Sequence, residues 1–180
     1  MAKNAREEKK KKVVDALNKA RSMELHAIYE YMNQHYNLTD MDYGELAARV
    51  KLIAIDEMRH AEMFAERIEE LGGQPTTDIA QKVVKGQSVE VIFPFDAGLE
   101  DDTIEVYDGF RELCRECGDT ISMKLFETII DEEQIHFTYF DNVGDHIRTL
   151  GQVYLAKIAG TPADAGTPAR GFVAFQGGAA

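Results

Sequence analysis

The chain has 180 residues, which is enough for one domain with a sizeable core. Its 32 acidic and 20 basic side chains give a formal net charge of −12, which argues against nucleic acid as the main partner because phosphates attract lysine and arginine. The acidic excess suits a protein that collects cations, although a merely solvated surface would have the same composition. No apolar run approaches the roughly 18 residues of a membrane span, and the N-terminus lacks the apolar segment of a secretory signal. We therefore expect a cytoplasmic protein with no membrane partner.

Apolar residues recur at helical spacing along most of the chain, and turn signals fall in few places. We predict four long helices: residues 6–35, residues 45–71, a third that begins between 88 and 96 and ends at 116, and residues 120–150. Gly72-Gly73 ends the second helix, and Gly118-Asp119 separates the third from the fourth. The inward faces are expected to carry Val13, Leu17, Ala20, Ala27, Ile28, Tyr31, Val50, Ile53, Phe64, Ile68, Leu71, Leu125, Phe126, Ile129, Phe140, Val143 and Ile147.

Two segments have a less regular pattern. Residues 89–95 look briefly strand-like, and Pro94 obscures the start of the third helix. Beyond Gly151 we predict a short last helix over residues 153–159. The tail of residues 161–180 is rich in Gly, Ala and Pro, and we expect it to be extended or disordered.

The lengths of the connections indicate the topology. A short turn at residues 37–44 and the break at residues 118–119 each join two antiparallel helices, whereas the connection at residues 72–87 is long enough to cross the bundle. This is the ferritin-like all-α four-helix bundle with a long crossover, here with a short fifth helix at the C-terminal end. The ferritin-like domain is expected to span residues 1–160.

Two Glu-x-x-His motifs lie on predicted helices, Glu57–His60 and Glu133–His136. Their spacing places the glutamate and the histidine on one helical face, about one turn apart. Glu24 precedes Glu57 by 33 residues, and Glu100 precedes Glu133 by the same 33. Because residues equidistant from a turn stand at the same height in an antiparallel pair, each pair of helices brings a glutamate level with a Glu-x-x-His motif.

The aromatic residues repeat with the same spacing. Tyr31, Phe64, Tyr107 and Phe140 each follow one of these four glutamates by seven residues. The two halves of the chain are therefore related by an internal pseudo-two-fold symmetry with an offset of 76 residues. Four carboxylates and two imidazoles are expected to meet inside the bundle.

Buried carboxylates repel one another and are costly to desolvate unless cations neutralise them. Two divalent metal ions would balance four carboxylates, and one Glu from each of two helices plus a Glu-x-x-His from each of the other two is the ligand set of di-iron and di-manganese carboxylate proteins. Ordinary surface glutamates, the alternative, would not align with apolar positions. Oxygen and imidazole ligands suit Fe(II) or Mn(II).

The roles of the six candidate ligands follow from their places. Glu57 and Glu133 are expected to bridge the two ions, Glu24 and Glu100 to bind terminally, and His60 and His136 to hold one ion each. Two Fe(II) ions held side by side could give two electrons to O2 or H2O2. Tyr31 could supply a further electron, although a packed core aromatic is the alternative interpretation of this residue.

The sequence resembles the bacterioferritins over roughly residues 10–159. The matching stretches are Met23–Leu25, Ile55–Glu62 and Asp131–His136, and Glu100 also falls at the family spacing. The resemblance implies iron storage and detoxification by a ferroxidase, in a hollow shell of twenty-four subunits assembled from dimers, with a ferric mineral inside. A small electron-transfer protein would be a further partner.

The resemblance also implies one haem per two subunits, held at two-fold interfaces by a methionine from each subunit. Met58 falls at that position and, one residue after Glu57, is rotated by about 100° from the di-iron cleft. Without the resemblance, a methionine on a helix flank would be interpreted as packing. Some members carry a histidine and an aspartate on the inner wall beneath the di-iron site; here Asp56 fits the acidic position, but Leu52 replaces the histidine.

The sequence features also allow other functions to be considered for a chain of this kind, each with a feature that speaks for or against it. A rubrerythrin-like di-iron peroxidase normally adds a domain with two C-x-x-C pairs, whereas this chain has only Cys114 and Cys117, which we interpret as packed thiols. A DNA-protecting mini-ferritin is favoured only by the basic run of residues 9–12. A manganese catalase would leave Met58 unexplained, and a plain haem-binding electron carrier would make the di-iron ligands vestigial.

Overall fold

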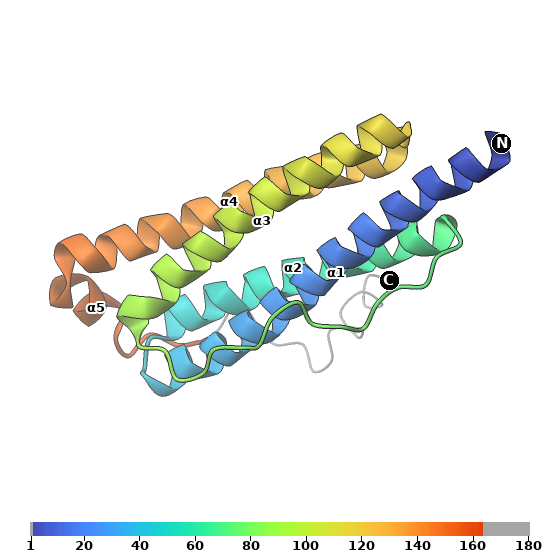
Figure 1. Cartoon of the computed structure of the whole chain (residues 1–180). Coiled ribbons are helices and arrows are strands. Elements are labelled where there is room, and N and C mark those ends of the chain that lie inside the picture. Colours follow the sequence, from blue (N-terminus) through green and yellow to red (C-terminus); the bar gives the residue numbers. More distant parts are fainter. Residues whose placement is uncertain (1, 164–180) are drawn as a thin grey trace, which may run out of the picture.

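The computed structural model describes residues 2–163, and in that part of the chain the regular structure is helical. Four long helices form the bundle and a short fifth helix lies at one end of it (Figure 1). Their bounds are α1 (Ala2–Asp40), α2 (Gly44–Glu70), α3 (Val89–Cys117), α4 (Thr120–Leu150) and α5 (Gln152–Ile158). None of these helices is both long and apolar enough to cross a membrane. The predicted all-α bundle with its short fifth helix is confirmed.

The connection between α2 and α3 runs along the length of the bundle beside α1 (Figure 1). The α1 side chains Asn18 and Arg21 donate hydrogen bonds to backbone oxygens at its beginning, and the amide of Val84 near its end donates to Glu30 at 2.8 Å. Polar side chains of α1 therefore satisfy the backbone of an irregular segment, as a buried or half-buried connection requires. The predicted long crossover is confirmed.

The prediction for residues 37–40 was wrong, because α1 continues through them and the turn is confined to residues 41–43. Leu38 is fully buried in the core, and the hydroxyl of Thr39 donates to the backbone oxygen of His35 within the helix. Packing of Leu38 thus outweighs the turn preference of its polar neighbours. The chain turns at Asp42, which has a positive φ of 65°.

The strand-like interpretation of residues 89–95 was also wrong, because α3 begins at Val89. The residues that face the core are Val89, Ile92 and Phe93, which recur at helical rather than alternating spacing. Pro94 lies inside the helix and cannot donate to the carbonyl four residues earlier. Gly144 of α4 faces the proline ring, so the two helices meet here without an intervening side chain.

The core lies in two apolar clusters along the bundle, with the polar centre described below between them. The predicted inward residues are buried, except Ile28, Leu71 and Leu125, which are half-buried.

The predicted break between α3 and α4 lies at residues 118–119. Gly118 ends α3 in the left-handed conformation at φ 78°, and the Asp119 side chain accepts a hydrogen bond from the amide of Ser122 at the start of α4.

Residues 159–163 are fixed against the turn between α1 and α2. The amide of Gly160 donates to the backbone oxygen of Asp42, and Thr161 forms a bridge with Tyr43. A Cβ on Gly44 would lie 2.0 Å from the backbone oxygen of Thr161, so only glycine fits there. The first residues of the predicted tail are thus attached to the bundle, residues 164–180 lie outside the described part, and the domain boundary at residue 160 stays a prediction.

Candidate metal centre

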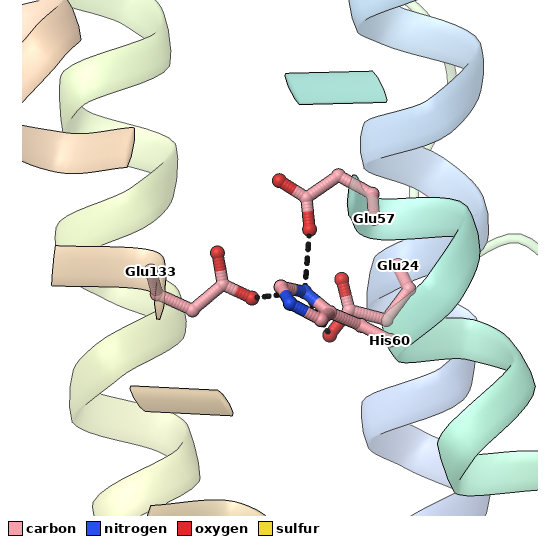
Figure 2. A group of neighbouring side chains, drawn as sticks. All are labelled: Glu24, Glu57, His60 and Glu133. Carbon is pink, nitrogen blue, oxygen red and sulfur yellow. Dashed lines mark hydrogen bonds and ion pairs between the residues drawn. The ribbon is translucent and has the colours of Figure 1, made fainter. Parts of the chain in front are cut away.

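The six residues predicted as metal ligands come together in the middle of the bundle, and each is at least nine-tenths buried. One helix of each antiparallel pair contributes a glutamate, and the other contributes a Glu-x-x-His motif. Figure 2 shows the side chains of Glu24, Glu57, His60 and Glu133 pointing toward one another from three helices. Long rigid helices place these groups at the same height, as the sequence spacing predicted.

The six side chains form two groups, each able to surround one ion. Glu24, Glu57, His60 and Glu133 make one group, and Glu57, Glu100, Glu133 and His136 make the other. In each group the potential ligand atoms lie within 4.8 Å of one another. Because Glu57 and Glu133 belong to both groups, they occupy the place of bridging ligands between two adjacent ions. Their role as ligands stays a prediction, but the arrangement matches it.

Both imidazoles present Nδ1 to the two shared carboxylates. Nδ1 of His60 lies 2.9 Å from an oxygen of Glu57 and 3.1 Å from an oxygen of Glu133. Nδ1 of His136 lies at the same two distances from the other oxygens of these carboxylates. The ring centroids of His60 and His136 are 5.9 Å apart. The two halves of the centre therefore repeat each other in space as well as in sequence.

These contacts set the charges of the metal-free centre. Burial would raise the pKa of Glu57, but hydrogen bonds from His136 and His60 outweigh it and hold this pKa at about 2. Burial would lower the histidine pKa values, but hydrogen bonds to Glu133 and Glu57 raise them to about 12 for His60 and about 10 for His136. Protons on the imidazoles thus neutralise the shared carboxylates.

The pKa values of the two terminal carboxylates, Glu24 and Glu100, shift in the opposite direction from that of Glu57. Burial, followed by the negative charges of Glu133 and Glu57, raises the pKa of both Glu24 and Glu100. Moreover, the four oxygens of Glu57 and Glu133 share two Nδ1–H donors, so two of these buried oxygens, Glu57 Oε1 and Glu133 Oε1, are short of a donor. Buried acceptors without donors are rare in folded proteins. Two divalent cations would supply positive charge to all four carboxylates and partners to both of these oxygens, so the residues fit a dinuclear metal centre.

Metal binding at this centre is expected to release protons. Because the pKa values of both imidazoles are raised above 7, each carries a proton at pH 7 that must leave before Nδ1 binds a metal. Loading with Zn(II), which is not oxidised, should release about two protons per subunit from the histidines alone. The apparent affinity should rise between pH 6 and pH 9, about tenfold per unit for each proton released.

Titration calorimetry in buffers with different ionisation enthalpies would measure this release. Zn(II) binding without net proton release, or with an affinity independent of pH over this range, would contradict the arrangement of charges described above.

Two tyrosines connect the halves of the centre through hydrogen bonds. Tyr31 Oη donates to Glu100 Oε1 and Tyr107 Oη donates to Glu24 Oε1, each at 2.5 Å. Each tyrosine thus binds the terminal glutamate of the other half. Burial, followed by the neighbouring carboxylate, raises the pKa of both phenols, which keeps them protonated as donors. Sequence reasoning assigned a role to Tyr31 alone, although the 76-residue offset that relates the two tyrosines was visible.

Two outer carboxylates complete the centre. Nε2 of His60 lies 2.9 Å from Glu132 Oε2, and Nε2 of His136 lies 3.7 Å from Asp56 Oδ2. A carboxylate that accepts a hydrogen bond from the second nitrogen of a metal-bound histidine fixes the ring and strengthens the ligand. Glu132 is close enough to His60 for this bond, whereas Asp56 lies beyond hydrogen-bond distance of His136. Sequence reasoning missed these roles. The signal was again the pseudo-symmetry, because Asp56 and Glu132 are also 76 residues apart.

The remaining predicted residues lie outside the centre. Met58 is 48% exposed on α2 and belongs to neither ligand group. Leu52 and Asp56 line a cavity of about 490 Å³ that reaches His136, and Leu52 offers no metal donor there. Cys114 is buried in the apolar core, which raises the pKa of its thiol to about 12 and makes it unreactive. Cys114 is thus a packed thiol as predicted, and Cys117 is a free, half-buried thiol that packs against the same core.

Comparison with known proteins agrees with this geometry. A family model described as a ferritin-like domain matches residues 14–150. The bacterioferritin of Desulfovibrio desulfuricans is 64% identical over 168 residues, which are 93% of this chain and 94% of that protein. The X-ray structure of the Desulfovibrio desulfuricans bacterioferritin, which describes its diiron site in different catalytic states, superposes with a TM-score of 0.90 and covers 93% of this chain and 98% of its own.

A more distant structure shows the same fold. The bacterioferritin of Rhodobacter capsulatus, described with a metal-free dinuclear site and a haem iron, is 28% identical. It superposes with a TM-score of 0.79 over 86% of this chain and 97% of its own. These similarities favour the bacterioferritin interpretation over a rubrerythrin or a mini-ferritin. The chain therefore belongs to the bacterioferritins, within the ferritin-like family.

Proposed function

We propose that this chain oxidises Fe(II) to Fe(III) at the dinuclear centre inside its own bundle, as the first step of iron storage. The observation that supports this most directly is the pair of ligand groups that share Glu57 and Glu133. Two shared carboxylates hold two ions close enough to act together on one oxidant. Two Fe(II) ions supply two electrons, which O2 or H2O2 can accept.

The surrounding residues hold and neutralise the ions. Glu24 and Glu100 would each bind one ion terminally, and His60 and His136 would each add a nitrogen ligand after losing the proton that they carry in the metal-free centre. The hydroxyls of Tyr31 and Tyr107 orient the terminal carboxylates. Tyr31, whose hydroxyl donates to Glu100, would supply a further electron to the oxidant, and its phenolic proton would pass to that carboxylate.

The shell and the haem are parts of the same proposal. Membership of the bacterioferritins leads us to expect an iron-storage shell, which we propose is assembled from dimers into twenty-four subunits around a ferric mineral. A methionine that is half-exposed on α2 suits a ligand shared with a second subunit, and a haem iron is described for the Rhodobacter capsulatus protein. Met58 would then hold one haem per two subunits, and the haem would carry electrons between a redox protein and the stored iron.

The experiment that tests this function is aerobic addition of Fe(II) to purified metal-free protein. We expect a fast phase of oxidation that saturates at about two Fe(II) per subunit, as two adjacent ligand groups require, followed by slower uptake into a particle much larger than the subunit. Absorbance in the near ultraviolet and size-exclusion chromatography would follow both. Oxidation no faster than in buffer alone would show that the centre has another function.

A further inference from the structure

A second buried polar cluster lies beside the dinuclear centre, formed by Glu30 and Gln34 of α1, Gln87 of the α2–α3 connection and Asp96 of α3. We call it the Glu30–Asp96 cluster. The exposed fractions are 8% for Gln87 and 0% for the other three residues. None of the four belongs to the six predicted ligands. Asp96 lies one turn before Glu100 on α3, and Glu30 directly precedes Tyr31.

The cluster has more hydrogen-bond acceptors than donors. Gln34 Nε2, which carries two hydrogens, faces three oxygens: Asp96 Oδ1 at 2.7 Å, Gln87 Oε1 at 3.0 Å and Glu30 Oε1 at 3.4 Å. Gln34 Oε1 and Asp96 Oδ2 are buried and have no partner. Nε2 of His26, also buried and unpartnered, points at Glu30 Oε2 from 3.7 Å.

Two buried carboxylates also lack a cationic side chain. Among residues 2–163, no lysine or arginine nitrogen lies within 4 Å of Glu30 or Asp96. Glu30 Oε2 accepts only the backbone amide of Val84. Burial raises the pKa of Asp96 well above its usual value, despite the hydrogen bond from Gln34, and burial raises the pKa of Glu30 as well. An ion or a proton must supply the missing positive charge.

The bundle itself does not require polar groups here. The 76-residue offset relates Glu30 to Val106, Gln34 to Phe110 and Asp96 to Ala20. In the symmetric layer these three apolar residues pack in the core. One layer of the bundle core is therefore apolar, whereas the layer related to it by the pseudo-symmetry contains carboxylate and amide side chains. Because the fold can be built with apolar side chains in this layer, the polar side chains of the Glu30–Asp96 cluster indicate that a ligand binds there.

We propose that the Glu30–Asp96 cluster binds one divalent cation of the oxygen-preferring class, through one carboxylate oxygen each of Glu30 and Asp96 and the amide oxygens of Gln34 and Gln87. If the Gln34 amide is rotated by 180°, Oε1 takes the position of Nε2. The Gln34 oxygen then lies next to the oxygens of Asp96, Gln87 and Glu30. Neighbouring ligands of Mg²⁺ or Ca²⁺ stand about 3.0 to 3.4 Å apart, close to the 2.7 to 3.4 Å found here.

The charges and the position agree with this assignment. Two carboxylates neutralise a divalent ion, and the ion supplies partners to the acceptors that now have none. Gln87 lies on the irregular connection between exposed residues, 84–86 and 88, so an ion can enter there without passing through the dinuclear centre. This site goes beyond the proposed ferroxidase function and does not depend on it.

Anomalous diffraction from crystals of the full-length protein soaked in Mn(II) tests the proposal. We expect a peak surrounded by Glu30, Gln34, Gln87 and Asp96, in addition to the peaks at the dinuclear centre. Asp96→Asn keeps the volume but removes the charge, so it should lose the first peak and keep the others. Asp101→Asn, which changes an exposed carboxylate on the same helix, should keep all of them.

Equilibrium dialysis should agree, with one Mn(II) fewer per subunit in Asp96→Asn and in Glu30→Gln than in Asp101→Asn. A filled dinuclear centre with no peak at the Glu30–Asp96 cluster would overturn the proposal, because Asp96 would then hold a proton instead. Retention of the peak in Asp96→Asn would overturn it too. Absence of metal from the dinuclear centre alone would contradict the ferroxidase function and leave this site standing.

Discussion

Glu57→Ala should abolish the fast phase of Fe(II) oxidation and leave the bundle folded. Glu57 belongs to both ligand groups, so its removal takes an oxygen ligand from each ion at once. Changing an outer partner of a metal ligand typically costs about 10- to 100-fold in metal affinity or activity, and loss of a shared ligand should cost more. The fold should persist, because removing one buried carboxylate relieves the repulsion that raises the pKa of Glu24 and Glu100.

Stopped-flow absorbance would measure the oxidation, and circular dichroism the helical content. Glu133→Ala should behave in the same way, since Glu133 is the second shared carboxylate. Glu66→Ala provides the matched control, because this glutamate is exposed on the same helix as Glu57. If either Glu57→Ala or Glu133→Ala oxidised iron at the parent rate, the assignment of the two bridging ligands would be wrong.

The positions of the six ligands could be predicted from the sequence because, on a rigid helix, the number of residues from the turn determines how far along the bundle axis a side chain lies. The repeated 33-residue interval brought Glu24 level with Glu57, and Glu100 level with Glu133, without any knowledge of side-chain packing. Helix ends were less predictable. Burial of Leu38 and of Ile92 carried α1 and α3 through residues whose local preferences favour a turn or a strand.

The hydrogen bonds around the ligands were harder to foresee. The bond from Tyr107 to Glu24 and the contact of Glu132 with His60 join different pairs of helices, so they depend on how the two pairs pack. The Glu30–Asp96 cluster depends further on the α2–α3 connection, which supplies Gln87. That segment has no periodicity, and hydrogen bonds to α1 hold it along the bundle.

Met58→Leu is expected to give a protein that assembles and oxidises iron but purifies without haem. Leucine keeps the volume and the apolar character, so the free energy of unfolding should change by less than about 1.5 kcal/mol. The change removes the thioether sulfur, which is the only soft donor at this half-exposed position of α2. With a methionine on each side of a two-fold axis, the parent protein should show the spectrum of a low-spin, bis-methionine haem, with one porphyrin per two subunits.

Met63→Leu is the matched control, because Met63 lies on the same helix but packs against the apolar core. It should retain the haem. If the haem carries electrons to the mineral, release of stored iron by an external reductant should slow in Met58→Leu, while uptake of Fe(II) should match the parent rate, because the dinuclear centre is intact. A normal six-coordinate haem spectrum in Met58→Leu would place the axial ligand elsewhere. A parent protein that binds no haem at all would leave Met58 as a packing residue at an interface between subunits.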